Sequence, residues 1–372
     1  MCIRDSAYTA TAPDRTRPPL DEVCRSVSRP KVIVDPAFRR MDEIFDPPTQ
    51  DRLFATADVV WARDEPMPSA AFLDEVATAD AVVFGAWRHG AEGLEAAGDR
   101  LVALLEVAGG HEHPGLDYQH ALERGIRVGS CAPAFGPVVA EMGLALGLAS
   151  VRGVADADRA MRHRSEAWLH EGNRHNATLL AATVGFVGCG GISRHLHALL
   201  RPFDITVLGY DPPLPEPVLR ERGIVPASLA QIFDDALVVF VLAAPNPGNR
   251  GLIDARLLER LGPGRSLVVL SRASLVDFDA VTEIATRRGF RVATDVYPAE
   301  PLPAEHPLRD CPQVLMTPHL AGALAPALHA IGSAVTDDLA AIFAGDAPTR
   351  LQYLDASNAD AVLQVRSDDP GA

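Results

Sequence analysis

The segment Val184–Ser193 reads Val-Gly-Phe-Val-Gly-Cys-Gly-Gly-Ile-Ser, which is a short apolar run that leads into a glycine-rich turn. Gly188 permits a tight turn, and Gly190 lets the backbone approach a pyrophosphate closely. A helix that begins near Gly191 would point its free N–H groups at that anion. The segment therefore predicts a strand, turn and helix that bind a dinucleotide. The predicted cofactor-binding residues of this turn are Gly188, Gly190, Gly191 and Ile192.

An acidic residue follows at the distance at which a dinucleotide site needs one. The next predicted strand, 205–210, is followed directly by Asp211, about 20 residues after the turn. In a dinucleotide site the ribose hydroxyls need a hydrogen-bond acceptor at this position. A carboxylate at this position repels a 2′-phosphate, so Asp211 favours NAD over NADP. The alternative interpretation is that Asp211 simply begins the loop that continues with Pro212 and Pro213.

Short aliphatic runs alternate with helix-like stretches along most of the chain, which predicts an α/β protein with parallel sheets. The stretches 137–151, 155–168 and 325–344 are the longest predicted helices. The predicted strands are 31–34, 59–62, 81–84, 101–106 and 127–129 in the first half, and 183–187, 205–210, 237–242, 266–270, 291–295 and 314–317 in the second. The last six strands match a doubly wound dinucleotide-binding fold.

Three charged residues, in the order Arg272, Glu300 and His319, each follow one of the late strands. Ligands of open parallel sheets bind at the carboxyl ends of the strands, so these side chains are candidates for catalysis. Arg272 offers a permanently charged fork for a carboxylate. A histidine exchanges protons near neutral pH, and Glu300 would hold the His319 ring and stabilise its protonated form. Each of the three, taken alone, also fits an ordinary surface or capping residue.

With this set and the glycine turn, the chain resembles the D-isomer-specific 2-hydroxyacid dehydrogenases over roughly Lys31 to Gln352. The resemblance places the family's catalytic Arg–Glu–His set on Arg272, Glu300 and His319. It places the contact with the nicotinamide carboxamide on Asp295, and the loop beside the cofactor on Pro245. It implies hydride transfer between NAD and a small 2-hydroxy or 2-keto acid, in a homodimer formed through the nucleotide domain.

The resemblance also implies the domain organisation. A Rossmann domain over 151–323 is inserted into a flavodoxin-like substrate domain formed by 30–150 and 324–356. The polar segments 1–29 and 357–372 are expected to be disordered. Residues 1–6 read as a cloning scar.

The chain departs from the family in its substrate loop, where Gly109 and Gly110 are followed by His111, Glu112 and His113. Gly110 and His111 are the expected substrate contacts, together with Arg272. Glu112 stands where the family has glycine, and its charge would repel an anionic substrate unless it points away or pairs with a histidine. Two histidines without further placed ligands do not predict a metal site. A second departure is Ala273, where the family has glycine after the catalytic arginine.

Composition excludes several classes of partner. The formal net charge is −15, from 49 acidic and 34 basic residues, which disfavours nucleic acid and anionic membranes. The five cysteines are widely spaced, and no uninterrupted apolar run reaches the roughly 18 residues that span a bilayer. The expected protein is cytoplasmic, with a small-molecule substrate.

Two other functions remain open from the residues. One is an NAD-sensing, corepressor-like protein without significant turnover, which the altered substrate loop favours. The other is a dehydrogenase of the same fold that acts on formate or phosphite. The sequence does not identify the 2-hydroxy acid or the physiological direction.

Overall fold

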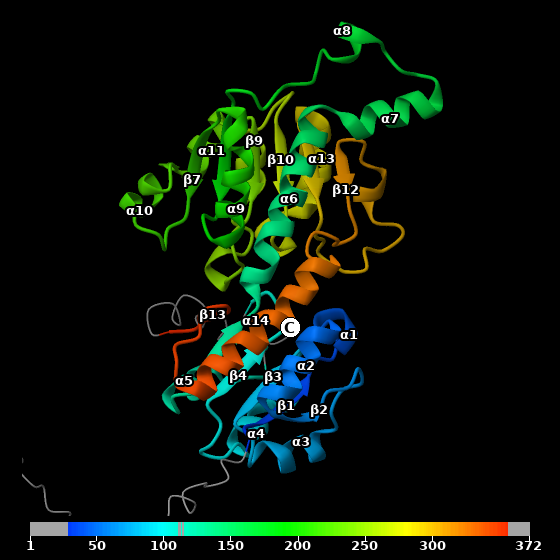
Figure 1. Ribbon diagram of the computed structural model, residues 1–372. Coiled ribbons are helices and arrows are strands. Elements are labelled where there is room, and N and C mark those ends of the chain that lie inside the picture. Colours follow the sequence, from blue (N-terminus) through cyan, green and yellow to red (C-terminus); the bar gives the residue numbers. More distant parts are fainter. Residues whose placement is uncertain (1–28, 111–112, 114, 356–372) are drawn as a thin grey trace, which may run out of the picture.

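The computed structural model describes residues 29–110, 113 and 115–355, which form two lobes joined by the long helices α6 (Ala132–Val151) and α14 (Ala325–Ala344) (Figure 1). The predicted disordered segments 1–29 and 357–372 lie outside these residues, apart from Arg29. Each lobe is built around one sheet, as the alternating pattern predicts.

The sheet of the first lobe has the strand order β13-β5-β4-β3-β1-β2. Its first five strands in chain order are parallel and follow the flavodoxin-like order 2-1-3-4-5. The sixth, at the edge, pairs antiparallel with β5. The strands are β1 (Lys31–Asp35), β2 (Asp58–Trp61), β3 (Ala81–Phe84), β4 (Ala103–Glu106), β5 (Arg127–Ser130) and β13 (Gln352–Tyr353).

The sheet of the second lobe is parallel throughout, in the order β12-β11-β10-β9-β6-β7-β8. The strand order reverses at β6, as in doubly wound dinucleotide-binding folds, so the predicted fold class is confirmed. The strands are β6 (Thr183–Val187), β7 (Thr206–Tyr210), β8 (Val225–Pro226), β9 (Val238–Val241), β10 (Ser266–Val269), β11 (Arg291–Thr294) and β12 (Val314–Met316). The two-residue strands β8 and β13 are too short to give a hydrophobic pattern and were not predicted.

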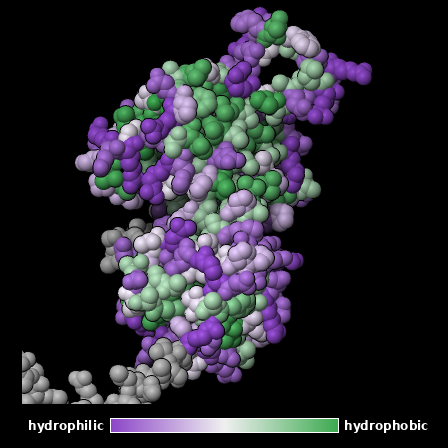
Figure 2. All heavy atoms as spheres, in the orientation of Figure 1, coloured by the Kyte–Doolittle hydropathy of each residue, from purple (hydrophilic) through white to green (hydrophobic). Residues whose placement is uncertain are grey.

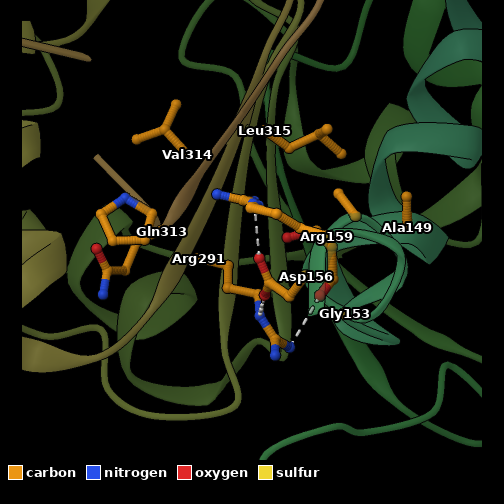
Figure 3. A pocket seen from close by; sticks show the side chains of 11 residues that line it. Ala149, Gly153, Asp156, Arg159, Arg291, Gln313, Val314 and Leu315 are labelled. Carbon is orange, nitrogen blue, oxygen red and sulfur yellow. Dashed lines mark hydrogen bonds and ion pairs between the residues drawn. The ribbon is translucent and has the colours of Figure 1, made fainter. Parts of the chain in front are cut away.

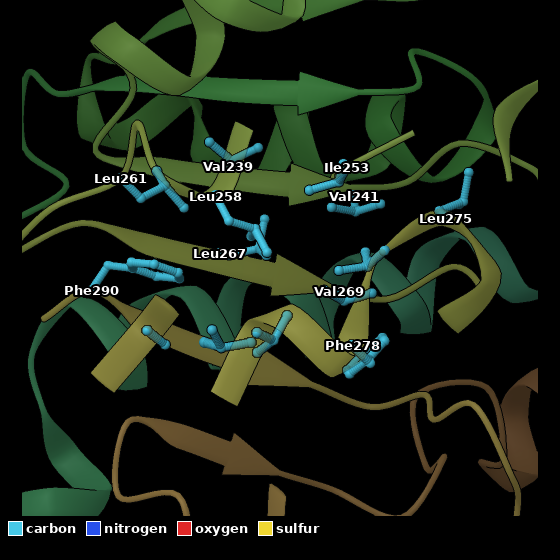
Figure 4. Close-up of a cluster of buried hydrophobic side chains, with 14 of the residues drawn as sticks. Val239, Val241, Ile253, Leu258, Leu261, Leu267, Val269, Leu275, Phe278 and Phe290 are labelled. Atoms are coloured by element: carbon cyan, nitrogen blue, oxygen red, sulfur yellow. The ribbon is translucent and has the colours of Figure 1, made fainter. Parts of the chain in front are cut away.

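Alternate residues of the central strands supply two hydrophobic cores, one on each face of the second sheet. Val239 and Val241 of β9 belong to the cluster that Figure 4 shows, together with Phe278 of α13 (Phe278–Arg288). Their neighbours Val238 and Phe240 pack in the cluster on the opposite face, which α6 covers. Burial on both faces explains why these strands read as continuous apolar runs.

The remaining helices lie around the sheets, apart from α7 and α8, which have no buried residues. In the first lobe they are α1 (Met41–Ile44), α2 (Pro47–Thr56), α3 (Ser69–Val76), α4 (Gly90–Glu95) and α5 (Tyr118–Glu123). In the second lobe they are α7 (Val154–His163), α8 (Leu169–Gly172), α9 (Gly191–Leu200), α10 (Glu216–Glu221), α11 (Leu229–Asp235), α12 (Ala255–Leu258) and α13 (Phe278–Arg288). Short 3-10 turns lie at Arg201–Phe203, Pro247–Asn249, Ala273–Leu275 and Pro307–Asp310.

Two predicted helix boundaries are wrong. Helix α6 begins at Ala132, five residues before the predicted start, and Pro137 lies inside it. The predicted helix 155–168 ends at His163, because Arg164 adopts the left-handed conformation (φ 57°) that closes a helix. The chain then continues as an arm that projects from the second lobe and includes α8 (Figure 1).

Small residues let α6 lie close to the nucleotide sheet. A Cβ at Gly143 would lie 2.8 Å from Cδ1 of Leu270, and one at Gly147 would lie 2.9 Å from Cζ of Phe240. By length and composition, α6 and α14 could each cross a membrane, which the criterion of uninterrupted apolar runs missed. About half of each apolar window is buried inside the protein, as in core helices.

The chain returns to the first lobe after the nucleotide-binding sheet. Helix α14 packs on α1 and α2, and the buried carboxylate of Asp338 accepts hydrogen bonds from the backbone N–H groups of Thr349, Arg350 and Leu351. This anchor leads the chain into β13 at the edge of the first sheet. The second sheet is thus inserted between parts of the first lobe.

Candidate active site

The glycine turn has the open backbone surface that a pyrophosphate needs. Gly188 has φ +95°, and a Cβ there would collide with the backbone of Ala243. Gly190 and Gly191 are exposed, and a Cβ at either would meet nothing within 4 Å. Helix α9 begins at Gly191, so its free N–H groups border this open surface. The turn fits a dinucleotide phosphate, and Ile192 follows in the first turn of the helix.

Ser193 replaces the third glycine of the dinucleotide pattern without disturbing the turn. Its side chain is buried, and its hydroxyl donates a hydrogen bond of 2.9 Å to the carbonyl oxygen of Gly190. The hydrogen bond therefore joins Ser193 to Gly190 across the first turn of α9, and it gives the buried hydroxyl a partner.

Asp211 is hydrogen-bonded to the glycine turn and does not simply begin a loop. Its Oδ2 accepts a hydrogen bond of 2.6 Å from the backbone N–H of Cys189, which ties the end of β7 to the glycine turn. Burial and the nearby Asp211 charge raise the pKa of the Cys189 thiol to about 12, so this cysteine stays protonated. Pro245 lies in the loop after β9, two residues beyond the Ala243 backbone that packs on Gly188.

The predicted acid–base pair is in direct contact. Nδ1 of His319 lies 2.6 Å from Oε2 of Glu300, and the other carboxylate oxygen accepts a hydrogen bond of 3.0 Å from the backbone N–H of Tyr297. Because an ionised glutamate only accepts hydrogen bonds, Nδ1 is the donor and Nε2 is left to act on a ligand. The His319 side chain is 47% exposed, so a ligand can reach it.

Arg272 comes from the neighbouring strand of the same sheet edge. Strands β10, β11 and β12 are parallel neighbours, so the loops that carry Arg272, Glu300 and His319 leave the sheet side by side. Arg272 is half-buried, and its Nη1 donates to the carbonyl oxygen of Ser271 at 2.9 Å. The following Ala273 has no positive φ and packs in the core, so this position needs no glycine.

Asp295 anchors the histidine loop, a role that the sequence pattern did not suggest. Its buried carboxylate accepts hydrogen bonds from the Thr317 hydroxyl (2.6 Å) and from the backbone N–H groups of Leu320 (2.9 Å) and Ala321 (2.8 Å). Asp295 is fully buried in this structure, so none of its atoms is exposed for the contact with nicotinamide that the resemblance implies.

Tyr297 braces the same loop. Its hydroxyl donates to the carbonyl oxygen of Thr317 at 2.9 Å. Burial and the carboxylates of Asp295 and Glu300 raise the pKa of Tyr297 to about 12, which keeps this donor protonated. With both braces in place, His319 itself adopts a left-handed backbone (φ 50°), which is uncommon for a residue other than glycine.

Comparison with known proteins identifies the family. Residues 144–321 match the family described as "D-isomer specific 2-hydroxyacid dehydrogenase, NAD binding domain". A crystal structure of a phosphoglycerate oxidoreductase from Rhizobium etli is 30% identical, with a TM-score of 0.78, and the similarity covers 88% of this chain and 98% of that one. This chain belongs to the D-isomer specific 2-hydroxyacid dehydrogenase family.

Curated relatives include members with different substrates. A D-3-phosphoglycerate dehydrogenase from Mycobacterium bovis is 28% identical over 81% of this chain and 52% of its own length. A glyoxylate reductase from Korarchaeum cryptofilum is 26% identical over 78% of this chain and 88% of its own. The chain spans about half the length of the phosphoglycerate dehydrogenases it matches, so the name of a relative does not assign its substrate.

Phe135, which the sequence did not single out, connects the expected substrate loop with the loop of His319. Gly110 is half-buried just beyond β4, whereas the predicted contact His111, and Glu112, lie outside the described residues. A Cβ at Gly109 would lie 3.5 Å from the Phe135 ring, and one at Gly322 would lie 3.0 Å from it. Phe135 of α6 therefore packs between the first lobe's substrate loop and the loop of His319.

A small hollow elsewhere on the second lobe is not part of this site. It lies at the amino ends of β11 and β12, where Arg291 pairs with Asp156 (Figure 3). Ligands of parallel sheets bind at the opposite, carboxyl edge.

The Asp295 anchor yields a prediction. Asp295→Ala should lower the free energy of unfolding by about 2–4 kcal/mol, because it leaves buried N–H groups without their charged acceptor. It should also lower kcat about 100-fold, because His319 loses its fixed position. Urea denaturation and steady-state kinetics measure the two effects, with the exposed Asp310→Ala as the matched control. A variant as stable and active as the wild type would show that the anchor is dispensable.

Proposed function

We propose that this chain is an NAD-dependent dehydrogenase that interconverts a D-2-hydroxy acid and the corresponding 2-keto acid. The observation that carries the proposal is the 2.6 Å contact between His319 and Glu300, on the same sheet edge as Arg272 and the glycine turn. A proton donor, a carboxylate-binding cation and a dinucleotide turn are the parts that reduction of a 2-keto acid requires.

Each residue has a distinct part in the reaction. Bound NADH would supply the hydride that goes to C2 of the keto acid. Arg272 would hold the substrate carboxylate and polarise the keto group, an interaction that strengthens as negative charge grows on the oxygen. His319 would deliver its Nε2 proton to that oxygen, while Glu300 holds Nδ1 and stabilises the charged ring. In the oxidation direction, His319 would take the hydroxyl proton instead.

The arrangement of Asp211 supports NAD rather than NADP. Among the described residues, its Oδ2 alone is engaged, by Cys189, which leaves Oδ1 for a ribose hydroxyl. The 2′-phosphate of NADP would be repelled at the same place.

The test is turnover of a panel of 2-keto acids with NADH or NADPH, followed by loss of absorbance at the nicotinamide band. We expect oxidation of NADH with at least one keto acid, and slower oxidation of NADPH. Binding of NAD without turnover of any keto or hydroxy acid would favour the sensor. Reduction of NAD by formate or phosphite alone would reassign the substrate.

We further propose that the chain forms a homodimer through the arm that follows α7. Trp168 and Leu169 are 68% and 84% exposed on this arm, and Figure 2 shows hydrophobic surface on the projecting part of the second lobe. The root of the arm is fixed, because Arg291 contacts Asp156 (3.2 Å) and Asn176 (3.0 Å). Exposed apolar residues on a fixed projection are typical of a surface that another subunit covers.

This dimer predicts the effect of a charge on the arm. Trp168→Glu should convert the dimer into a monomer, because the new carboxylate would be buried without a partner. Light scattering after size exclusion measures the mass, and the exposed Leu180→Glu outside α7 and α8 serves as the control. A wild-type chain that is already monomeric at micromolar concentration would contradict the proposed dimer.

A further inference from the structure

Arg39 lies at the carboxyl edge of the first sheet, in the loop that follows β1. Its Nε donates a hydrogen bond of 3.2 Å to the carbonyl oxygen of Val107. Val107 directly follows β4 and precedes Gly109 and Gly110 of the substrate loop. Arg39 is therefore tied to the base of the loop that faces the catalytic residues through Phe135.

Two aromatic rings hold the Arg39 guanidinium. Its central carbon lies 5.0 Å from the ring centroid of Phe38 and 5.6 Å from that of Phe135. Phe135 is the ring that also packs on Gly109 and on Gly322 of the His319 loop. One side chain thus contacts the Arg39 guanidinium, the substrate loop and the loop of His319.

The backbone beside Arg39 is strained. Phe38 has φ +69°, a region that a bulky side chain rarely adopts because it is sterically unfavourable. Its ring is nevertheless 61% exposed, so burial of the ring does not offset this cost. Strain of this kind is concentrated at ligand-binding loops.

Arg39 has no carboxylate partner within 4.0 Å among the residues that the structure describes. The chain has 49 acidic residues, and the neighbouring Arg40 pairs with Asp42 at 2.9 Å. Arg39 is also half-buried, and burial lowers the pKa of its guanidinium. The Glu43 charge acts on the guanidinium only from beyond 4.0 Å, and a partly desolvated cation without a directly paired carboxylate is stabilised when an anion binds to it.

We propose that Arg39 binds a second anionic group of the substrate, so that the substrate is a 2-hydroxy or 2-keto acid with two anionic groups. This inference rests on the proposed function. Arg272 would take the carboxylate next to the reacting carbon, and Arg39 would take the distal group.

The geometry of Arg39 suits a distal group with two oxygens. Nε donates to Val107, and within the described part of the chain the two terminal nitrogens donate no hydrogen bond, so they remain as a planar fork. Such a fork matches a carboxylate or a phosphate, and stacking on aromatic rings leaves its edge free to donate. A distal methyl or hydroxymethyl group would leave the Arg39 charge uncompensated.

The experiment compares keto acids that differ in the distal group. The probes are 2-oxoglutarate, its analogue 2-oxopentanoate, which lacks the distal carboxylate, and 3-phosphonooxypyruvate, each assayed for kcat/KM with NADH. The variants are Arg39→Gln, Arg39→Lys and, as the matched control, the exposed Arg40→Gln. Melting temperatures show whether each variant is folded, and calorimetry measures binding of the same keto acids with and without NAD.

We expect the wild type to prefer one of the dianions over 2-oxopentanoate by about 10- to 100-fold, the value of one charge-assisted hydrogen-bonded pair. Arg39→Gln should remove this preference, Arg39→Lys should restore part of it, and Arg40→Gln should preserve it. The preferred dianion distinguishes a distal carboxylate from a distal phosphate.

Two results would overturn the inference: no preference for either dianion in the wild type, or an equal loss of kcat/KM in Arg39→Gln for substrates with and without a distal anionic group. If no keto acid is turned over, the proposed function fails separately, and the calorimetric preference then decides. A dianion preference in binding that depends on Arg39 supports the subsite without catalysis, and its absence rejects it.

Discussion

His319→Ala should lower kcat for reduction of a 2-keto acid by about 10²–10⁴-fold, the usual contribution of a positioned acid–base group. The alanine removes the only group that we place as proton donor, whereas the glycine turn that binds the dinucleotide lies on a different loop. The dissociation constant for NADH, measured by fluorescence titration, should therefore stay within about twofold. Stopped-flow kinetics with NADH would show a slowed hydride step and not a slowed release of product.

Glu300 and a distant histidine supply the controls for this result. Glu300→Gln keeps a hydrogen-bond acceptor for Nδ1 of His319 but removes the charge that stabilises the protonated ring, so an intermediate loss of kcat is expected. The exposed His120→Ala on α5 should be as active as the wild type. Near-normal turnover in His319→Ala would require a different proton donor and would contradict the mechanism.

Arg272→Gln should lower kcat/KM for 2-keto acids by about 10²–10⁴-fold, because two charge-assisted hydrogen bonds are worth about 1.5–3 kcal/mol each. Loss of carboxylate binding raises KM, and loss of carbonyl polarisation lowers kcat, so both constants should change. Arg272→Lys should recover only part of the activity, since an ammonium group lacks the planar fork. Steady-state kinetics with the best substrate of the keto-acid panel measures these changes.

The exposed Arg256→Gln on α12 is the matched control for the loss of one positive charge. It should leave kcat/KM unchanged if the effect belongs to the site and not to the net charge. An Arg272→Gln variant with a raised KM but an unchanged kcat would mean that Arg272 binds the carboxylate without acting on the carbonyl. An unchanged kcat/KM would place the substrate carboxylate elsewhere.

Local patterns were sufficient to predict the sheets and the acid–base pair. Strand β6 and the start of α9 were predicted at Thr183 and Gly191, because an apolar run followed by glycines has few other structures. The Glu300–His319 contact was expected because both residues follow parallel strands of one sheet. The start of α6 was misplaced because proline is common in the first turn of a helix and Pro137 was taken for its beginning.

The sequence alone determined the alternation of strands and helices, the dinucleotide turn and the order of Arg272, Glu300 and His319, since each depends on residues that are near neighbours in the chain. Only the tertiary structure decided what Asp295, Phe135 and Arg39 contact. Apart from Phe38 beside Arg39, the partners named above lie 22 to 187 positions away in the sequence, so no local periodicity records them. Tertiary packing brings these residues together. It makes Asp295 the anchor of the His319 loop, places Phe135 between the lobes, and leaves Arg39 without a carboxylate within 4.0 Å among the described residues.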